Sequence, residues 1–395
     1  MSAQLHESVL HFSAHPLLWV LARLARRAGL LWKVPGLGVM VSDAECAREI
    51  LRRDRDFSKN GTGSFAQAMT AALGPMALGN MDGDDHRCLR TAIADVLAPA
   101  RADMLVRCRG GDLASMCARL ARGDCVDLVH FTRGWSGRIA FDVVGIAPPV
   151  TQEEEACHEI VRLSERLASV LGFRDPSRRQ ARIALADRER LAAYFREGYE
   201  RSALPSSLAD RLQTLGFTFD EAVGLLLIYI IGGTLTISAA LPRIIALLVD
   251  SGAFAQLRKD PTGIPRAIDE GLRFITPLPG TVRIVQRDTI VQGHRLTAGT
   301  RLVILTHNLA RDEKLFPDPD RFDITRMHNP RAARLWYGAG PHRCAGFNLA
   351  QRELKAALSA MVGVGREFRV VKRRASIGAL IPAYARLVIQ AVPDS

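Results

Sequence analysis

Cys344 is the residue whose surroundings point most directly to chemistry. It lies in residues 337–346, Tyr-Gly-Ala-Gly-Pro-His-Arg-Cys-Ala-Gly, where Gly338 and Gly340 permit the backbone angles of a tight turn. The following segment, 348–358, has the composition of a helix. Because a helix N-terminus offers unpaired N–H groups and a positive dipole, we expect Cys344 to be a thiolate held ready for a metal ion.

These ten residues resemble the haem-binding loop of cytochrome P-450 monooxygenases, with Tyr337 where the family usually has Phe. The resemblance implies that Cys344 ligates the iron of haem b, and that Tyr337 and Gly338 belong to the cofactor-binding loop. A buried structural cysteine in a glycine-rich turn is the alternative interpretation.

Two further motifs follow the family's order. Glu270 and Arg273 are three residues apart, so they project from one face of a predicted helix. Residues 316–322, Phe-Pro-Asp-Pro-Asp-Arg-Phe, resemble the family's meander, which implies that Arg321 completes a Glu-Arg-Arg cluster. We interpret these three as structural residues that brace the cysteine loop, and an ordinary surface ion pair is the alternative.

The two propionates of a haem need cationic or hydrogen-bonding partners when the macrocycle is enclosed. His86 and Arg90 lie one helical turn apart, as in the family's helix beside the haem. Arg283 and His342 match the remaining propionate contacts that the resemblance implies. For each of these residues, a solvated surface position is the alternative.

A long apolar helix is predicted around Gly232 and Gly233, and it contains Thr236. Glycine costs about 1 kcal/mol relative to alanine inside a helix, so the pair indicates a reason such as the close approach of a flat ligand. The resemblance implies that Thr236 is the family's oxygen-activating threonine, which helps to deliver protons. The alternative is a hydroxyl bonded back to its own helix.

Leu235 departs from the family's pattern, because an Asp or Glu usually precedes the threonine. Leucine cannot exchange protons, so an ordinary proton relay is in doubt; Thr234, Ser238 or the substrate could order water instead. Two kinds of reaction are then open. One is hydroxylation with a rearranged proton relay, and the other is less usual chemistry such as oxidative coupling, desaturation or nitrogen-group transfer. Pro242 is expected to bend or interrupt the helix.

Substrate contacts are implied by the resemblance alone, and core packing is an equal alternative for each residue. They suggest a mostly apolar small molecule, aromatic or terpenoid-like, in secondary metabolism. The residues are Phe65, Met69, Met76, Ile231, Leu278, Val282, Leu380 and Ile381.

Composition bounds these interpretations. The 395 residues are 48% hydrophobic, enough for a core that encloses a cofactor. Seven cysteines without a Cys-x-x-Cys pair argue against a disulfide scaffold or zinc module and favour a reducing cytoplasm.

The formal net charge of +12 comes from dispersed basic residues, so we expect no nucleic-acid partner. Arginines interrupt residues 16–27, so we predict a surface or partly buried helix there and no membrane span.

Helical periodicity dominates residues 44–54, 86–120, 152–200 and 219–270, whereas 281–305 has the pattern of short strands. With the motif order, this predicts a mainly α protein with small β-sheets, the cytochrome P-450 fold, in a single domain over residues 1–395.

Neither a flavin nor an iron–sulfur motif accompanies the cysteine loop. The resemblance therefore implies a ferredoxin and an NAD(P)H-dependent ferredoxin reductase as electron donors. A basic docking patch for them is expected from Arg331, Arg334, Arg343, Arg352 and Lys355. Peroxide-driven turnover is an alternative enzyme, and a haem-thiolate binding or sensor protein is the non-enzyme alternative.

Overall fold

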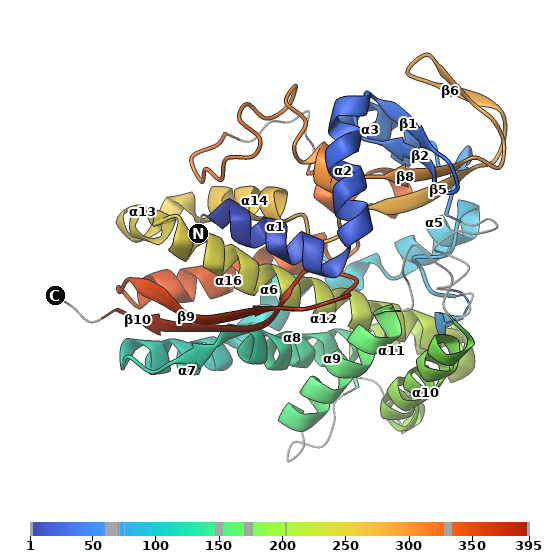
Figure 1. The fold of residues 1–395 in the computed structure, drawn as a ribbon. Helices are drawn as coiled ribbons and strands as arrows, with labels where there is room; N and C mark the ends of the chain where they lie inside the picture. The colour runs from blue at the N-terminus through green and yellow to red at the C-terminus, as the bar shows by residue number, and fades with distance from the viewer. Residues whose placement is uncertain are drawn as a thin grey trace.

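Helices form most of the structure, a computed structural model that describes residues 3–59, 70, 72–74, 76–146, 153–169, 177–201, 204–327 and 334–392 (Figure 1). The helices are α1 Ala3–Ala14, α2 Pro16–Ala28, α3 Ala44–Arg52, α5 Gly83–Ala92, α6 Pro99–Cys108, α7 Gly110–Ala121, α8 Leu128–Val144, α9 Glu153–Ser169, α10 Arg178–Arg201, α11 Leu208–Thr214, α12 Phe219–Asp250, α13 Ala253–Lys259, α14 Ile264–Ile275, α15 Thr306–Leu309 and α16 Phe347–Gly363.

Three small sheets accompany the helices. Their strands are β1 Leu31–Val34, β2 Gly38–Val41, β3 Phe57–Ser58, β4 Val126–Asp127, β5 Thr281–Val285, β6 Thr289–Val291, β7 His294–Leu296, β8 Arg301–Ile304, β9 Phe368–Ala375 and β10 Tyr384–Ala391. The largest sheet has the order β1-β2-β8-β5-β3, and the others are β4-β10-β9 and β6-β7. In the largest sheet, β2 pairs with β8 in parallel, with Met40 opposite Val303.

Helix α12 runs through the middle of the helical part and packs against α8, α9, α14 and α16 (Figure 1). Its start is fixed by a capping box in which the backbone N–H of Thr218 donates to the Glu221 carboxylate at 2.8 Å. The helix continues through Pro242, so the predicted interruption is wrong. Apolar side chains around the neighbouring turns are buried, and this packing outweighs the hydrogen bond that proline cannot donate.

Among the helices that the structure describes, α12 alone is long and apolar enough to span a membrane, and 72% of its most apolar stretch is buried within the protein. That burial is what a core helix requires. Helix α2 covers the predicted segment 16–27, and its Ala22 and Ala25 are buried against the largest sheet, as a partly buried helix should be.

The sequence periodicities located the helices but merged several of them. Residues 86–120 form parts of α5, α6 and α7, because the chain turns at a 3₁₀ segment, Ala94–Leu97, before Pro99 begins α6. The mainly α fold with small sheets is confirmed. Strands β9 and β10 were not predicted, since arginines at exposed positions obscure their alternation.

Candidate active site

The cysteine loop, residues 337–346, contains a tight turn, and at position 340 only glycine fits. Gly338 and Gly340 have φ angles of +75° and +66°, in the left-handed region that glycine adopts readily, and the chain turns tightly there as the sequence predicted. A Cβ at Gly340 would lie 2.3 Å from the backbone oxygen of Leu51, at the end of α3. The N–H of Cys344 donates to the carbonyl of Tyr337 at 2.9 Å and closes the turn. The loop therefore packs closely against the end of α3.

Aromatic contacts fix the same loop to α16, which begins three residues after the cysteine. The rings of Tyr337 and Phe347 meet edge to face, with centroids 4.9 Å apart. Gln351 donates from Nε2 to the Tyr337 hydroxyl at 3.2 Å, and Arg343 lies 4.6 Å over the Phe347 ring. The cysteine thus has a defined position at the start of the helix.

Cys344 itself is solvent-exposed in the structure, although most of its surroundings are protein. Burial raises the pKa of its thiol above the ordinary value, while the Gly346 N–H, Arg90 and Arg343 act in the opposite direction. Desolvation outweighs the helix N-terminus in the metal-free protein, so the thiolate that is expected to hold a metal ion stays a prediction. A metal ion that binds this sulfur would displace the proton.

Cationic side chains from distant segments gather beside this loop. The rings of His86 from α5 and His342 lie with centroids 4.2 Å apart, and His342 donates from Nε2 to Asp82 Oδ1 at 2.9 Å. Arg90 from α5 donates to the carbonyl of Arg343. Arg283 on β5 is buried and bonds the carbonyl of Val282 at 2.8 Å. The four predicted cationic residues are therefore brought together.

The charges in this cluster, formed by His86, Arg90, Arg283, His342 and Lys59, are unbalanced. Burial first, then neighbouring cations, lowers the pKa of His86 and of His342 to about 4. Burial lowers the pKa of Lys59 to about 7 and that of Arg283 to about 10. In the part of the chain that the structure describes, neither His86 ring nitrogen has a hydrogen-bond partner, and Arg283 has no ion pair. Near pH 7 the two imidazoles of this cationic cluster are therefore neutral hydrogen-bonding groups, and its positive charge comes from the arginines. The combination is suited to an anion.

On α12, Gly232 is exposed although it lies in a mostly buried helix, and a Cβ there would meet nothing within 4 Å. A Cβ at Gly233 would touch only Ala140, at 3.9 Å. Thr236 donates from its hydroxyl to the carbonyl of Gly232 at 2.7 Å. The structure therefore has the alternative arrangement, in which the Thr236 hydroxyl bonds to its own helix. The hydroxyl oxygen can still accept a hydrogen bond.

The buried brace behind the loop has a different third member from the one predicted. Arg273 binds Glu270 through two bonds of 2.7 and 2.8 Å, as expected. Arg326 places Nε 3.2 Å from the same carboxylate, whereas the side chain of Arg321 is exposed and only its carbonyl accepts from Arg273. The prediction of Arg321 is wrong, because the meander turns so that the later arginine points inward.

Residues 264–374, which contain this brace, part of the cationic cluster and the cysteine loop, match the sequence model of the cytochrome P-450 family. Over these residues the chain is similar to cytochromes P-450.

Solved structures of this family have the same fold. A structure of P450BioI in complex with hexadec-9Z-enoic acid ligated acyl carrier protein superposes with a TM-score of 0.83 at 20% identity, covering 97% of this chain and 99% of that one.

Curated relatives are themselves cytochromes P-450 or oxygenases. The chain is 37% identical over 131 residues to 20-oxo-5-O-mycaminosyltylactone 23-monooxygenase of Streptomyces fradiae, an alignment covering 33% of this chain and 30% of that protein. It is 27% identical over 293 residues to C-19 steroid 1alpha-hydroxylase of Sorangium cellulosum, covering 72% and 73%. The first relatives are thus matched over about a third of their length.

The residues of this chain fit the family's haem. Cys344 is exposed, and a Cβ at Gly232 would meet nothing within 4 Å. The cationic cluster includes the buried imidazole of His86, whose two nitrogens have no hydrogen-bond partner within the described residues. Sequence reasoning missed Lys59, Asp82 and Arg326. Asp82 precedes α5 as an ordinary helix cap would, so no pattern marked its bond to His342.

Side chains of this chain that are expected to contact substrate are dispersed. Leu380 and Ile381, between β9 and β10, line a cavity of about 250 Å³ together with Leu235 of α12. The side chains of Ile231 and Met76 pack in or against the main core, and Leu278 is exposed. Val282, on β5 of the largest sheet, is buried in the small apolar cluster that includes Ala22 and Ala25 of α2. Phe65 and Met69 lie outside the described residues.

Proposed function

We propose that this chain is a haem-thiolate monooxygenase of secondary metabolism that oxidises a mostly apolar small molecule with dioxygen. The observation that carries the proposal is the position of Cys344, which is exposed three residues before α16 and close enough to Arg90 of the cationic cluster for that guanidinium to lower its pKa. When bound, haem b supplies the redox and oxygen chemistry that no side chain of the protein supplies. The oxygenase names of the curated relatives support this.

The chain's own residues then have distinct tasks. Cys344 would ligate the iron of a bound haem. The propionates would be neutralised and hydrogen-bonded by Arg283, Arg90, His86, His342 and Lys59. Gly232 and Gly233 would leave room for the cofactor, and Thr236 would hold or move a proton at its hydroxyl. The brace of Glu270, Arg273 and Arg326 keeps the loop in position.

Leu235 makes proton movement in this enzyme unusual. It points toward the 250 Å³ cavity rather than supplying an acid, and Ser238 lines the same cavity. The hydroxyl of Ser238 lies 3.2 Å from that of Ser136, so the two can order water there. We infer a rearranged water path, with a substrate hydroxyl or amine as a further proton source.

We propose that the protein is a single domain that works in the cytoplasm. Its electrons would come from a ferredoxin and an NAD(P)H-dependent ferredoxin reductase. In the expected docking patch, Arg334 and Arg352 are already paired with Asp269 and Asp103 at 2.7 and 2.6 Å. Arg343 and Lys355 are exposed and have no ion-pair partner within the described ranges, so they carry the attraction for an acidic partner. Arg331 lies outside the described residues.

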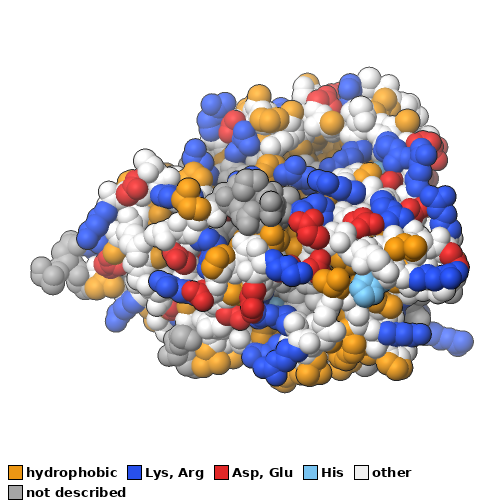
Figure 2. All heavy atoms as spheres, turned by 90° about the horizontal axis from the view of Figure 1, so that it is seen from above, with side chains coloured by type: hydrophobic (Ala, Val, Ile, Leu, Met, Phe, Trp, Pro, Cys, Tyr) orange, Lys and Arg blue, Asp and Glu red, His pale blue; other side chains and the backbone are white. Residues whose placement is uncertain are grey.

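Surface charge elsewhere is mixed. Figure 2 shows Lys and Arg side chains interspersed with Asp and Glu on the face seen from above, without a field of one sign. This distribution supports a local docking patch over a general affinity for polyanions.

The decisive experiment is the absorption spectrum of the reduced protein with carbon monoxide. Wild type should show the red-shifted Soret band of a thiolate ligand, and Cys344→Ala should lose it. Cys125→Ser, a matched change at an exposed cysteine, should keep it. A wild-type protein without this band, or an unchanged band in Cys344→Ala, would contradict the proposed function.

Activity requires a second measurement. Small molecules are screened for a shift of the Soret band, and those that bind are incubated with ferredoxin, reductase and NAD(P)H. Product that depends on all three supports the monooxygenase. Product formed equally well with peroxide alone would favour the peroxide-driven alternative, and electron consumption that never rises with any ligand would favour a sensor.

A further inference from the structure

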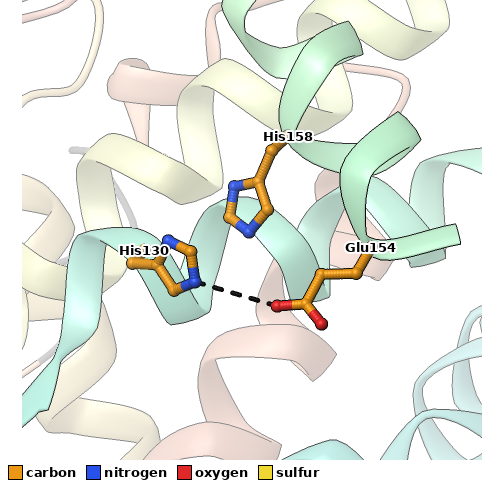
Figure 3. A group of neighbouring side chains, drawn as sticks. All are labelled: His130, Glu154 and His158. Carbon is orange, nitrogen blue, oxygen red and sulfur yellow. Dashed lines mark ion pairs between the residues drawn. The ribbon is translucent and has the colours of Figure 1, made fainter. Parts of the chain in front are cut away.

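Two histidines and a glutamate meet on the surface where α8 and α9 pack together, away from the cysteine loop. His130 comes from α8, and Glu154 and His158 come from α9 (Figure 3). One ligand atom of each residue lies within 4.8 Å of the other two. In Figure 3 the three side chains point toward one another. We propose that His130, Glu154 and His158 form a binding site for a divalent transition-metal ion such as Zn²⁺ or Ni²⁺.

The spacing along each helix supports this arrangement. Glu154 and His158 are four residues apart, so they project from one face of α9 toward α8. Position 134 of α8, one turn after His130, is glycine, and a Cβ there would lie 3.5 Å from His158 Nε2. The missing side chain lets His158 reach the surface of α8 beside His130.

The donor set selects the metal. Two imidazoles and one carboxylate suit zinc and nickel, whereas calcium and magnesium prefer oxygen donors alone. Three protein ligands leave further coordination positions for water. His130 Nε2 lies 3.8 Å from the Glu154 carboxylate, a separation that a tetrahedral ion could bridge after a small side-chain movement.

The flexibility of the ligands makes that movement easy. The side chains of His130 and Glu154 are 64% and 69% exposed, so they can rotate without disturbing the core. The imidazoles of His130 and His158 now stack with centroids 4.2 Å apart and planes at 17°. A turn of the exposed His130 ring brings its Nε2 lone pair toward the position between the three residues.

Neighbouring charges do not oppose the ion strongly. Two cations of α8 act on His158, and both are paired: Arg133 with Glu165 at 2.5 Å, and Arg138 with Glu153 at 3.3 Å. Burial, and next to it His130, lowers the pKa of His158, which keeps that ring neutral and able to bind metal at neutral pH.

A bound ion would tie α9 to α8. Helix α9 also contributes Arg166 and Ser169 to the 250 Å³ cavity beside Leu235, at its other end. The ion would therefore fix the first turns of a helix whose last turn borders this cavity. This inference needs neither haem nor oxygen chemistry, so it stands or fails separately from the proposed function.

The test is calorimetric titration of the haem-loaded full chain, free of any histidine tag, with ZnCl₂ and with NiCl₂. We expect saturation at one ion per chain. His130→Ala, His158→Ala and Glu154→Gln should each weaken binding about tenfold or more. His294→Ala, which removes an exposed histidine on β7, should leave the affinity unchanged.

Each variant retains all seven cysteines, so metal bound to thiols cannot imitate the pattern. As a second measurement, Zn²⁺ should slow amide hydrogen exchange in residues 153–159 of wild type and not of His158→Ala. Failure to saturate with either ion would overturn the proposal. Affinity that is the same in wild type and all three variants would overturn it too.

Discussion

The imidazole rings of His86 and His342 lie 4.2 Å apart although 256 residues separate them in the chain, and only His342 has a hydrogen-bond partner within the described structure. Asp82 orients His342, and His86 keeps both nitrogens free for a ligand. Arg283 and Lys59 act on the same rings, and burial lowers the pKa of His86 and of Arg283. An anion bound among these side chains would account for residues that are otherwise costly to bury.

Arg283→Leu should weaken haem binding. A hydrogen bond to a charged group contributes about 1.5–3 kcal/mol, so transfer of haem to an excess of apo-globin should become about 10- to 100-fold faster. Arg295→Leu, on the exposed hairpin strand β7, is the control and should transfer haem at the wild-type rate. Equal rates for wild type and Arg283→Leu would show that Arg283 does not contact the propionates.

Arg326→Ala should destabilise the protein more than Arg321→Ala. Arg326 binds the buried Glu270 and donates to the Pro317 carbonyl at 2.6 Å, so its loss should cost about 1–3 kcal/mol of unfolding free energy. Arg321 has an exposed side chain, and its replacement should change stability by about 0.5 kcal/mol or less. Urea unfolding of both variants measures the difference, and the opposite order would restore the prediction made from the motif.

Gly232→Ala and Gly224→Ala should have opposite effects, although both lie inside α12. The Cβ at 232 meets open space, so alanine should stabilise the haem-free protein by up to about 1 kcal/mol through helix propensity. The Cβ at 224 would lie 2.7 Å from the carbonyl oxygen of Leu73 and force the backbone to move. Thermal unfolding of both variants provides the measurement; a lower melting temperature for Gly232→Ala would contradict the open space.

Glu353→Gln should flatten the dependence of stability on pH. Burial raises the pKa of Glu353 well above its ordinary value of 4.5, so the folded protein keeps a proton that the unfolded chain releases. Stability from this group is therefore complete below pH 4.5 and declines as pH rises toward the folded pKa. Glutamine carries no such proton. Urea midpoints between pH 5 and 8 should slope less than in wild type or in the exposed control Glu313→Gln, and parallel slopes would refute the assignment.

Leu235→Asp should change either the products or the fraction of consumed electrons recovered as product. The reason is that a carboxylate in the 250 Å³ cavity would supply an acid that the present water path lacks. Leu235→Asn, which has the same shape without the acid, is the matched control. If Leu235→Asp raises turnover with the same products and the same electron recovery, the leucine has no special role.

Local spacing predicted what adjacent residues determine. The turn at Gly338 and Gly340, the helix after Cys344 and the pair of Glu270 with Arg273 were all found from the sequence, because each depends on contacts within a few residues. The Thr236 hydroxyl could be placed on α12, but whether it bonds its own helix depends on rotamer choice.

Other features depend on which distant segments meet. Arg326 could not be separated from Arg321, since only the path of the meander decides which guanidinium reaches Glu270. Lys59 becomes part of the cationic cluster only because its strand end lies beside Asp82. The thiolate of Cys344 stays a prediction for a related reason: the sequence reveals the helix dipole, whereas the pKa of the sulfur also depends on the protein packed around it.

The parallel pairing of β2 with β8 also bears on synthesis of the chain. Val39, Met40 and Val41 bond to residues 302–304, so some 260 residues must leave the ribosome before this part of the sheet can close. Until then the apolar edge of β2 has no partner and is open to contact with other chains. Chaperone dependence during expression, and recovery that improves when translation is slowed or cooled, are expected consequences of this long-range strand pair.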